Sequence, residues 1–269
     1  MGIVLLFIAS IPSALVSQIV GEDNSAVMII IRAVLSIVSV YLLVHLYIVR
    51  GFKLSLEEFR IFKAKNLGVW TLVAIALPLA VSCFFIFFIP GTFAVSGLSK
   101  TDTIRSAVYA FFNYCLVAGI TEELIFRAFI MRLLEKRWNK FVAVLVPSVI
   151  FGLLHIPNMD DFKILDVLML LIAGTAVGIM FSLIAYQSGS IWASTLVHGL
   201  WNFCGGILEI SVNPDPSIFT YTLDNSSTLL TGGAFGTESS LPAVIGYIVV
   251  IFIALILQRQ NLNKGHTSR

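Results

Sequence analysis

The sequence predicts an all-α, polytopic membrane protein with about eight transmembrane helices in a single integral membrane domain over residues 1–269. Only 12% of its residues are charged and 58% are hydrophobic, with a mean hydropathy of +0.96. A soluble domain carries about 25% charged residues and needs a polar surface. Apolar runs long enough for a membrane helix recur along the chain, and the alternation typical of spanning strands is absent. A soluble enzyme, a disordered chain and a secreted disulfide scaffold are therefore excluded.

The apolar runs define the expected spans. In chain order they cover residues 3–20, 26–48, 68–89, 104–134, 141–156, 164–186, 191–210 and 241–258. We interpret residues 3–20 as a membrane helix because no basic region supports a cleaved signal peptide. The run 104–134 is long enough to tilt or project, and the short run 141–156 contains Pro147. Spans four, five and seven are expected to form a catalytic core.

Basic residues predict the orientation of these helices. They concentrate in the connection 49–67, in the connection 135–140 and after residue 258, whereas the connections between these, including 211–240, are poor in Lys and Arg. The positive-inside rule therefore predicts that both termini are cytoplasmic. The net charge of +2 is too small to indicate a nucleic-acid partner. We expect an integral protein of a plasma membrane, in a prokaryote, with the lipid bilayer as a partner.

The connections and small residues allow further expectations. Residues 54–65 mix apolar and charged side chains, which fits either an amphipathic surface helix or a solvated loop. The polar segment 211–240 is expected to be an external cap or a mobile excursion. Gly174 and Gly178 are typical of close helix packing within one chain. The three cysteines lie in apolar runs without metal-binding spacing, so we expect inert core thiols.

Ionisable residues at membrane depth are candidates for function because burying them is costly. Arg32 and His45 lie near the ends of a span, where their side chains can reach the surface. Glu123 and Arg127 are four residues apart and can form an ion pair along one helix face. Glu122 points about 100° away from that face. It is therefore the carboxylate that is free for chemistry.

Two further patterns lie on separate apolar segments. Phe151 and His155 share one helix face, as do His198 and Asn202. Taken singly, a membrane histidine is usually a packing residue and an asparagine usually joins helices. Together with Glu122 they provide a base, two imidazoles and an amide donor, which water activation and oxyanion stabilisation require. The rival functions are a proton- or ion-coupled transporter and a non-catalytic membrane partner, such as an immunity protein.

The three patterns, Glu122-Glu123-x3-Arg127, Phe151-x3-His155 and His198-x3-Asn202, resemble those of the CPBP family of intramembrane proteases, also called the ABI family. This family includes CAAX proteases and bacteriocin-processing enzymes. The resemblance covers residues 104–205, the expected protease core.

The resemblance implies a membrane endopeptidase with eight helices. By this resemblance, Glu122 and His155 are expected to activate a water, and His198 and Asn202 are expected to bind the oxyanion. Glu123, Arg127 and Phe151 are the residues expected to support this site.

Cofactor and substrate follow less directly from the sequence. An HExxH motif is absent and an amide is a poor zinc ligand, so we favour metal-free, glutamate-dependent hydrolysis. The alternative is zinc held by Glu122, His155 and His198. A prenylated CAAX peptide, a leader peptide and a membrane-inserted protein all fit as substrates.

Overall fold

The computed structural model describes residues 25–159, 162–224 and 227–267, with side chains up to residue 261. The expected first span, residues 3–20, lies outside this part of the chain. Five described helices are long and apolar enough to cross a membrane: Ala26–Gly51, Leu67–Phe88, Lys140–Asn158, Ile164–Ser188 and Leu241–Asn261. They coincide with five of the expected spans, and the chain folds as a helical membrane protein. A count of eight spans is not shown by this structure.

The expected fourth span is one continuous helical rod that is longer than predicted. It runs through α4 (Lys100–Tyr109), η3 (Ala110–Ala118), α5 (Gly119–Glu123), η4 (Leu124–Ile130) and α6 (Met131–Arg137). Ser99 begins it as an N-cap, because its side chain accepts a hydrogen bond from the Asp102 amide. The segments η3 and η4 are π-helical, a conformation that is common at functional sites. They flank the two adjacent glutamates on α5.

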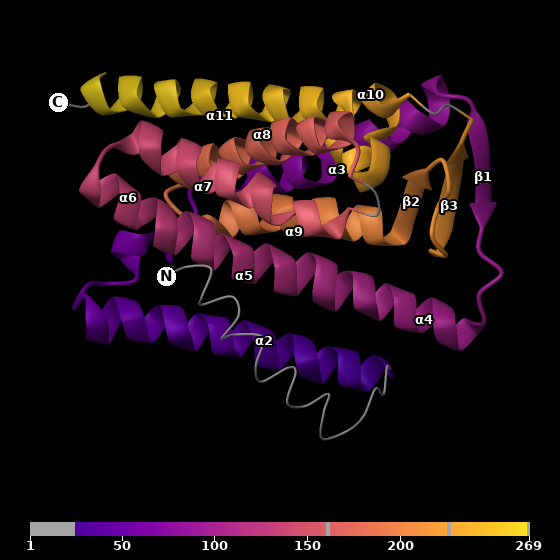
Figure 1. The fold of residues 1–269 in the computed structure, drawn as a ribbon. Helices are drawn as coiled ribbons and strands as arrows, with labels where there is room; N and C mark the ends of the chain where they lie inside the picture. Colours follow the sequence, from indigo (N-terminus) through magenta and orange to yellow (C-terminus); the bar gives the residue numbers. More distant parts are fainter. Residues whose placement is uncertain (1–24, 160–161, 225–226, 268–269) are drawn as a thin grey trace.

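The remaining helices form a bundle around this rod. They are α2 (Ala26–Leu46), α3 (Leu67–Phe88), α7 (Lys140–Leu154), α8 (Ile164–Ser188), α9 (Ile191–Ile207) and α11 (Leu241–Thr267). In Figure 1, α2 and α11 lie on opposite sides, with α7, α8, α9 and α3 between them. The buried core between α3, α8, α9 and α11 includes Trp70, Phe85, Phe181 and Tyr247.

Glycines allow a close contact between α7 and α8. A Cβ atom on Gly174 of α8 would lie 2.6 Å from the Cα atom of Gly152 on α7. A Cβ atom on Gly178 would lie 2.8 Å from the Cα atom of Ser148. The two glycines therefore serve close packing within one chain, as their spacing predicted.

A three-stranded sheet at one end of the bundle was not predicted. Its order is β1 (Gly91–Val95), β3 (Phe219–Leu223) and β2 (Leu208–Ser211), with β1 antiparallel and β2 parallel to β3. The expected seventh span ran to residue 210, but α9 ends at Ile207 and the chain continues as β2. That prediction was wrong by a few residues because Leu208 and Ile210 extend the apolar run of the helix beyond its end, although the polar Glu209 and Ser211 alternate with them.

The segment 211–240 folds as a cap, one of its two predicted forms. It contains β3, α10 (Thr228–Thr231) and the short turns η6 (Gly233–Phe235) and η7 (Thr237–Ser239). The buried Asp166 of α8 accepts a hydrogen bond of 3.2 Å from the Ala234 amide. Tyr247 of α11 donates a hydrogen bond of 3.0 Å to the main-chain oxygen of Glu238. The cap is thus fastened to two membrane helices.

Residues 54–65 form a loop and not the alternative amphipathic helix. Their helical structure is the 3-10 turn η2 (Glu57–Phe59), which buries Phe59 completely. Arg60 joins the loop to α6 through an ion pair of 2.6 Å with Glu135.

Candidate functional site

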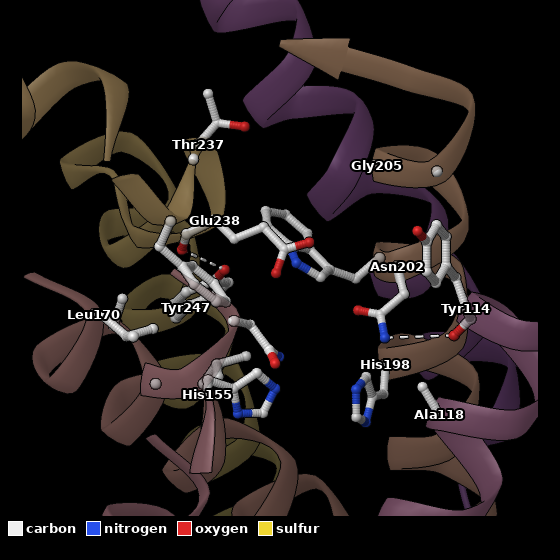
Figure 2. A pocket seen from close by; sticks show the side chains of 18 of the residues that line it. Tyr114, Ala118, His155, Leu170, His198, Asn202, Gly205, Thr237, Glu238 and Tyr247 are labelled. Atoms are coloured by element: carbon white, nitrogen blue, oxygen red, sulfur yellow. Dashed lines mark hydrogen bonds between the residues drawn. The ribbon is translucent and has the colours of Figure 1, made fainter. Parts of the chain in front are cut away.

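One cavity of about 390 Å³ gathers the four side chains that the sequence predicts as catalytic. Glu122, His155, His198 and Asn202 all line it, although they come from three separate helical segments. Figure 2 shows His155 and His198 on opposite sides of this cavity, with Asn202 beyond His198 on the same helix. The predicted Phe151 also contributes to the lining.

Glu123 is the centre of a buried polar network below the cavity. Its side chain is fully buried and lies 3.1 Å from Arg127 Nη1, the ion pair that the spacing of four residues predicted. The Ser194 hydroxyl donates a hydrogen bond of 2.6 Å to its other oxygen. Arg127 also donates to the carbonyl oxygen of Gly178 and lies 4.7 Å from the ring centre of Phe151. A buried pair with these additional partners holds α5 against α8 and α9.

Glu122 lies on the same short helix but faces the cavity. Its side chain is 24% exposed, and its Oε2 atom lies 3.8 Å from His198 Nε2. That oxygen is buried and has no hydrogen-bond partner among the described residues. Glu122 is therefore the carboxylate that can take up a proton without breaking an existing hydrogen bond.

His198 connects the two glutamates through its two ring nitrogens. Its Nδ1 atom lies 3.2 Å from Glu123 Oε1, and its ring stacks on Phe181 at 4.5 Å. Because a carboxylate only accepts, Nδ1 carries the hydrogen and Nε2 faces Glu122 and the cavity. The contact between α5 and α9 permits this, because a Cβ atom on Gly119 would lie 3.2 Å from Gly199.

His155 is the C-cap residue of α7 and begins the turn that follows. It was expected within the helix and instead lies directly after it. Its Nδ1 atom lies 2.7 Å from the Phe151 carbonyl oxygen, and the two rings are 4.6 Å apart. A carbonyl oxygen only accepts, so Nδ1 again carries the hydrogen. Nε2 is then the nitrogen of His155 that can bind a water or accept a proton.

Asn202 lies one helical turn after His198. Its Nδ2 atom donates a hydrogen bond of 3.4 Å to the main-chain oxygen of Tyr114, drawn as a dashed line in Figure 2. An amide group has two N–H hydrogens, so this contact leaves one for a ligand in the cavity.

The cap adds acidic residues that no sequence motif indicated. Figure 2 shows Glu238 entering the cavity from the side opposite His155 and His198. Burial raises the pKa of Glu238, although His155, His198 and the Trp201 indole oppose the shift. Only the fold brings this carboxyl to the site.

Glu209 of β2 is the second acidic residue of the cap side and also lines the cavity. Burial, followed by the charges of Glu238 and Asp215, raises the pKa of Glu209 to about 7. The sequence did offer a signal for Glu209, an ionisable residue inside the expected span 191–210, but no motif connected it with the other candidates.

Several other predicted groups lie outside the cavity. Arg32 and His45 do not line it, and the His45 ring packs against Tyr41 at 6.0 Å. The three cysteines are unpaired, and Cys83 is exposed on α3, so it is not the core thiol that was expected. Glu122, His155 and His198, the ligands of the zinc alternative, share the cavity. Among the described residues no three His, Cys, Asp or Glu side chains are arranged to hold a metal ion.

Comparisons with known proteins bear on the same segment. Residues 104–204 match the family model described as Type II CAAX prenyl endopeptidase Rce1-like. The chain is also 30% identical over 137 residues to "Putative membrane peptidase YdiL" of Bacillus subtilis (strain 168), a match that covers 50% of each chain. The chain thus spans about half the length of the curated relative it matches. The resemblance to the CPBP family is confirmed, and the family match over residues 104–204 contains all seven predicted site residues.

Proposed function

We propose that this protein is an intramembrane endopeptidase that hydrolyses a peptide bond with a water activated by Glu122 and His155. The observation that carries the proposal is the unpartnered carboxylate oxygen of Glu122 in a cavity shared with two imidazoles. A transporter and a non-catalytic partner protein are the rival functions. The family match supports the peptidase over both.

The proposed reaction begins with a water between Glu122 and Nε2 of His155. Glu122 takes a proton from this water, and the resulting hydroxide attacks the carbonyl carbon of the substrate. The carbonyl oxygen becomes an oxyanion, which accepts a hydrogen bond from the remaining side-chain N–H of Asn202. His198 can donate to it through Nε2 only when both ring nitrogens are protonated. The C–N bond then breaks, and the proton held by Glu122 passes to the leaving amine.

Three further residues position the catalytic side chains in the proposed site, namely Glu123, Arg127 and Phe151. Glu123 fixes the ring of His198 through Nδ1, and Arg127 compensates the charge of Glu123. The main-chain oxygen of Phe151 fixes the ring of His155. An orienting partner on Nδ1 directs Nε2 of each histidine toward the substrate.

The substrate class follows from the description of the matching family. A peptide with a prenylated, C-terminal CAAX sequence is the first candidate. Leader peptides and membrane-inserted segments are the alternatives that the sequence leaves open. We also propose that the protein resides in the plasma membrane of a prokaryote with both termini in the cytoplasm, since basic residues concentrate in alternate connections.

The test uses the purified full chain in detergent and a farnesylated peptide with a fluorophore and a quencher on either side of the CAAX cleavage site. We expect Glu122→Gln to lower kcat/KM by about 10²- to 10⁴-fold, because the amide cannot accept the proton of water. Glu58→Gln, in an exposed pair with Lys136, is the matched control and should retain activity. Equal cleavage by the wild type and Glu122→Gln would refute the proposal.

Metal dependence is measured on the same preparation. We expect that a chelator leaves kcat/KM unchanged and that elemental analysis finds no stoichiometric zinc. Zinc at one equivalent, with activity that is lost on chelation and restored by zinc, would replace the glutamate mechanism with the metallo alternative.

A further inference from the structure

The sheet has two edges in different surroundings. β1 forms one edge, and four of its five residues are exposed. β2 forms the other edge, where Ile210 is buried and Leu208, Glu209 and Ile210 line the cavity of the candidate site. Figure 1 shows β1 on the outside of the molecule and β2 beside the helix ends. One edge of the sheet is therefore a wall of the cavity.

Part of the main chain of β2 is available at that wall. In a sheet, alternate residues of a strand direct their N–H and C=O groups to one neighbour and the others direct theirs to the opposite side. β2 pairs with β3 from Leu208 to Ser211. Among the described residues, β2 makes a further main-chain hydrogen bond besides its bonds to β3. The Leu208 amide donates it to the Cys204 oxygen at the end of α9. The edge that faces away from β3 thus retains unpaired groups.

The available edge continues directly from the proposed catalytic groups. The cavity wall passes from Asn202 through Gly205 and Gly206 to Leu208. A Cβ atom on Gly206 would lie 2.5 Å from the Tyr114 ring, and one on Gly205 would lie 3.4 Å from Glu238 Oε1. Glycine at both positions leaves bare main chain between Asn202 and β2. A Cβ atom at position 206 would collide with the Tyr114 ring beside Asn202, whereas one at position 205 would be in ordinary contact with Glu238.

The spacing fits an extended peptide. Six helical residues from Asn202 to Leu208 cover about 9 Å at 1.5 Å each. An extended chain covers this distance with about three residues, at 3.3 Å each. A substrate whose scissile carbonyl lies at Asn202 would therefore reach the β2 edge about three residues away.

We propose that β2 binds the peptide substrate by strand addition, with a segment about three residues from the scissile bond paired to its open edge. This inference rests on the proposed peptidase function. An extended peptide that leaves water for the cavity needs partners for its main-chain groups, and a strand edge provides them without a fixed side-chain sequence. Ser211, whose buried hydroxyl has no partner among the described residues, offers a further polar group at the end of the strand.

The first experiment changes the substrate and leaves the enzyme intact. Single amide nitrogens of the farnesylated fluorogenic peptide are methylated in turn, which removes one donor at each position. We expect kcat/KM to fall about three- to ten-fold at every second position beginning near the third residue, with smaller changes between. A uniform or absent effect in that region would overturn strand addition. Failure of the unmodified peptide to be cleaved by the wild type would instead count against the proposed function.

The second experiment locates the contact on the protein. Hydrogen–deuterium exchange is measured on Glu122→Gln with and without the same peptide, so that no cleavage occurs. Binding should slow exchange in the segment 207–212 and leave β1, the other edge, unchanged as an internal control. Peptide binding, measured by fluorescence anisotropy, without protection of 207–212 would refute the inference. Equal protection of β1 and β2 would also refute it, because it would indicate a general tightening of the sheet.

Discussion

The two sides of the cavity differ in how their chemistry is encoded. The helical side carries Glu122, His155, His198 and Asn202 on α5, α7 and α9, with spacings that the sequence displays. The cap side carries Glu238 on η7 and Glu209 on β2, which belong to no motif. On the helical side His155, His198 and Asn202 each have a hydrogen bond to the fold, whereas Oε2 of Glu122 has none within the described part of the chain. We propose that the helical side performs the proposed hydrolysis and that the cap side shapes the space for the substrate.

The largest effect on stability is expected from Glu123→Gln. This change leaves the fully buried Arg127 without its compensating charge and replaces the carboxylate that orients His198 with a neutral amide. Losing one partner of a buried pair costs about 3–5 kcal/mol. The thermal unfolding midpoint in detergent should fall sharply, or the protein should fail to accumulate.

The matched control for that change is Glu58→Gln. Its pair with Lys136 is 2.9 Å long, with side chains 39% and 35% exposed, so water screens the pair and the loss of stability should be far smaller than for Glu123→Gln. Equal destabilisation by the two substitutions would show that the network below the cavity does not hold the helical side together.

A smaller effect, on activity, is expected from Glu238→Gln. Glu238 acts on His155 and His198 through charge across the cavity. We expect kcat/KM for the farnesylated peptide to change about tenfold or less, well below the change expected for Glu122→Gln. A loss as complete as that of Glu122→Gln would place the cap among the catalytic groups and end the division between the two sides.

The smallest effect is a pH dependence of stability at Glu209. The folded-state pKa is about 7, above the unfolded value of about 4.3, so folding favours the protonated carboxyl. The contribution of Glu209 to the free energy of unfolding is therefore fully present below about pH 4.3, and it declines as the pH rises through 7. Glu209→Gln should therefore raise the thermal unfolding midpoint relative to wild type at pH 8 and leave it unchanged at pH 4. An equal difference at both pH values would contradict the burial of this carboxyl.

The helical part of the fold was predictable because lipid imposes a simple rule on the chain. A span must be apolar over a fixed length and must satisfy its own hydrogen bonds, so 26–48, 68–89, 141–156, 164–186 and 241–258 could be located from composition. The strand β2 could not, because its alternation of apolar and polar residues covers only four positions directly after an apolar helix, too few to distinguish a strand from the end of that helix. β1 and β3 are short strands outside the apolar spans, and their pairing joins segments more than 120 residues apart.

The sequence by itself determined which side chains could be catalytic. Helical periodicity separated Glu122 from Glu123 and paired the latter with Arg127, because residues four apart share a face. The tertiary structure decided what those residues meet: Nδ1 of His198 at Glu123, Nε2 of the same ring at Glu122, and a cap that brings Glu238 opposite them. These contacts arise where glycines let helices approach and where a loop folds back, and such long-range packing is not expressed in local spacing.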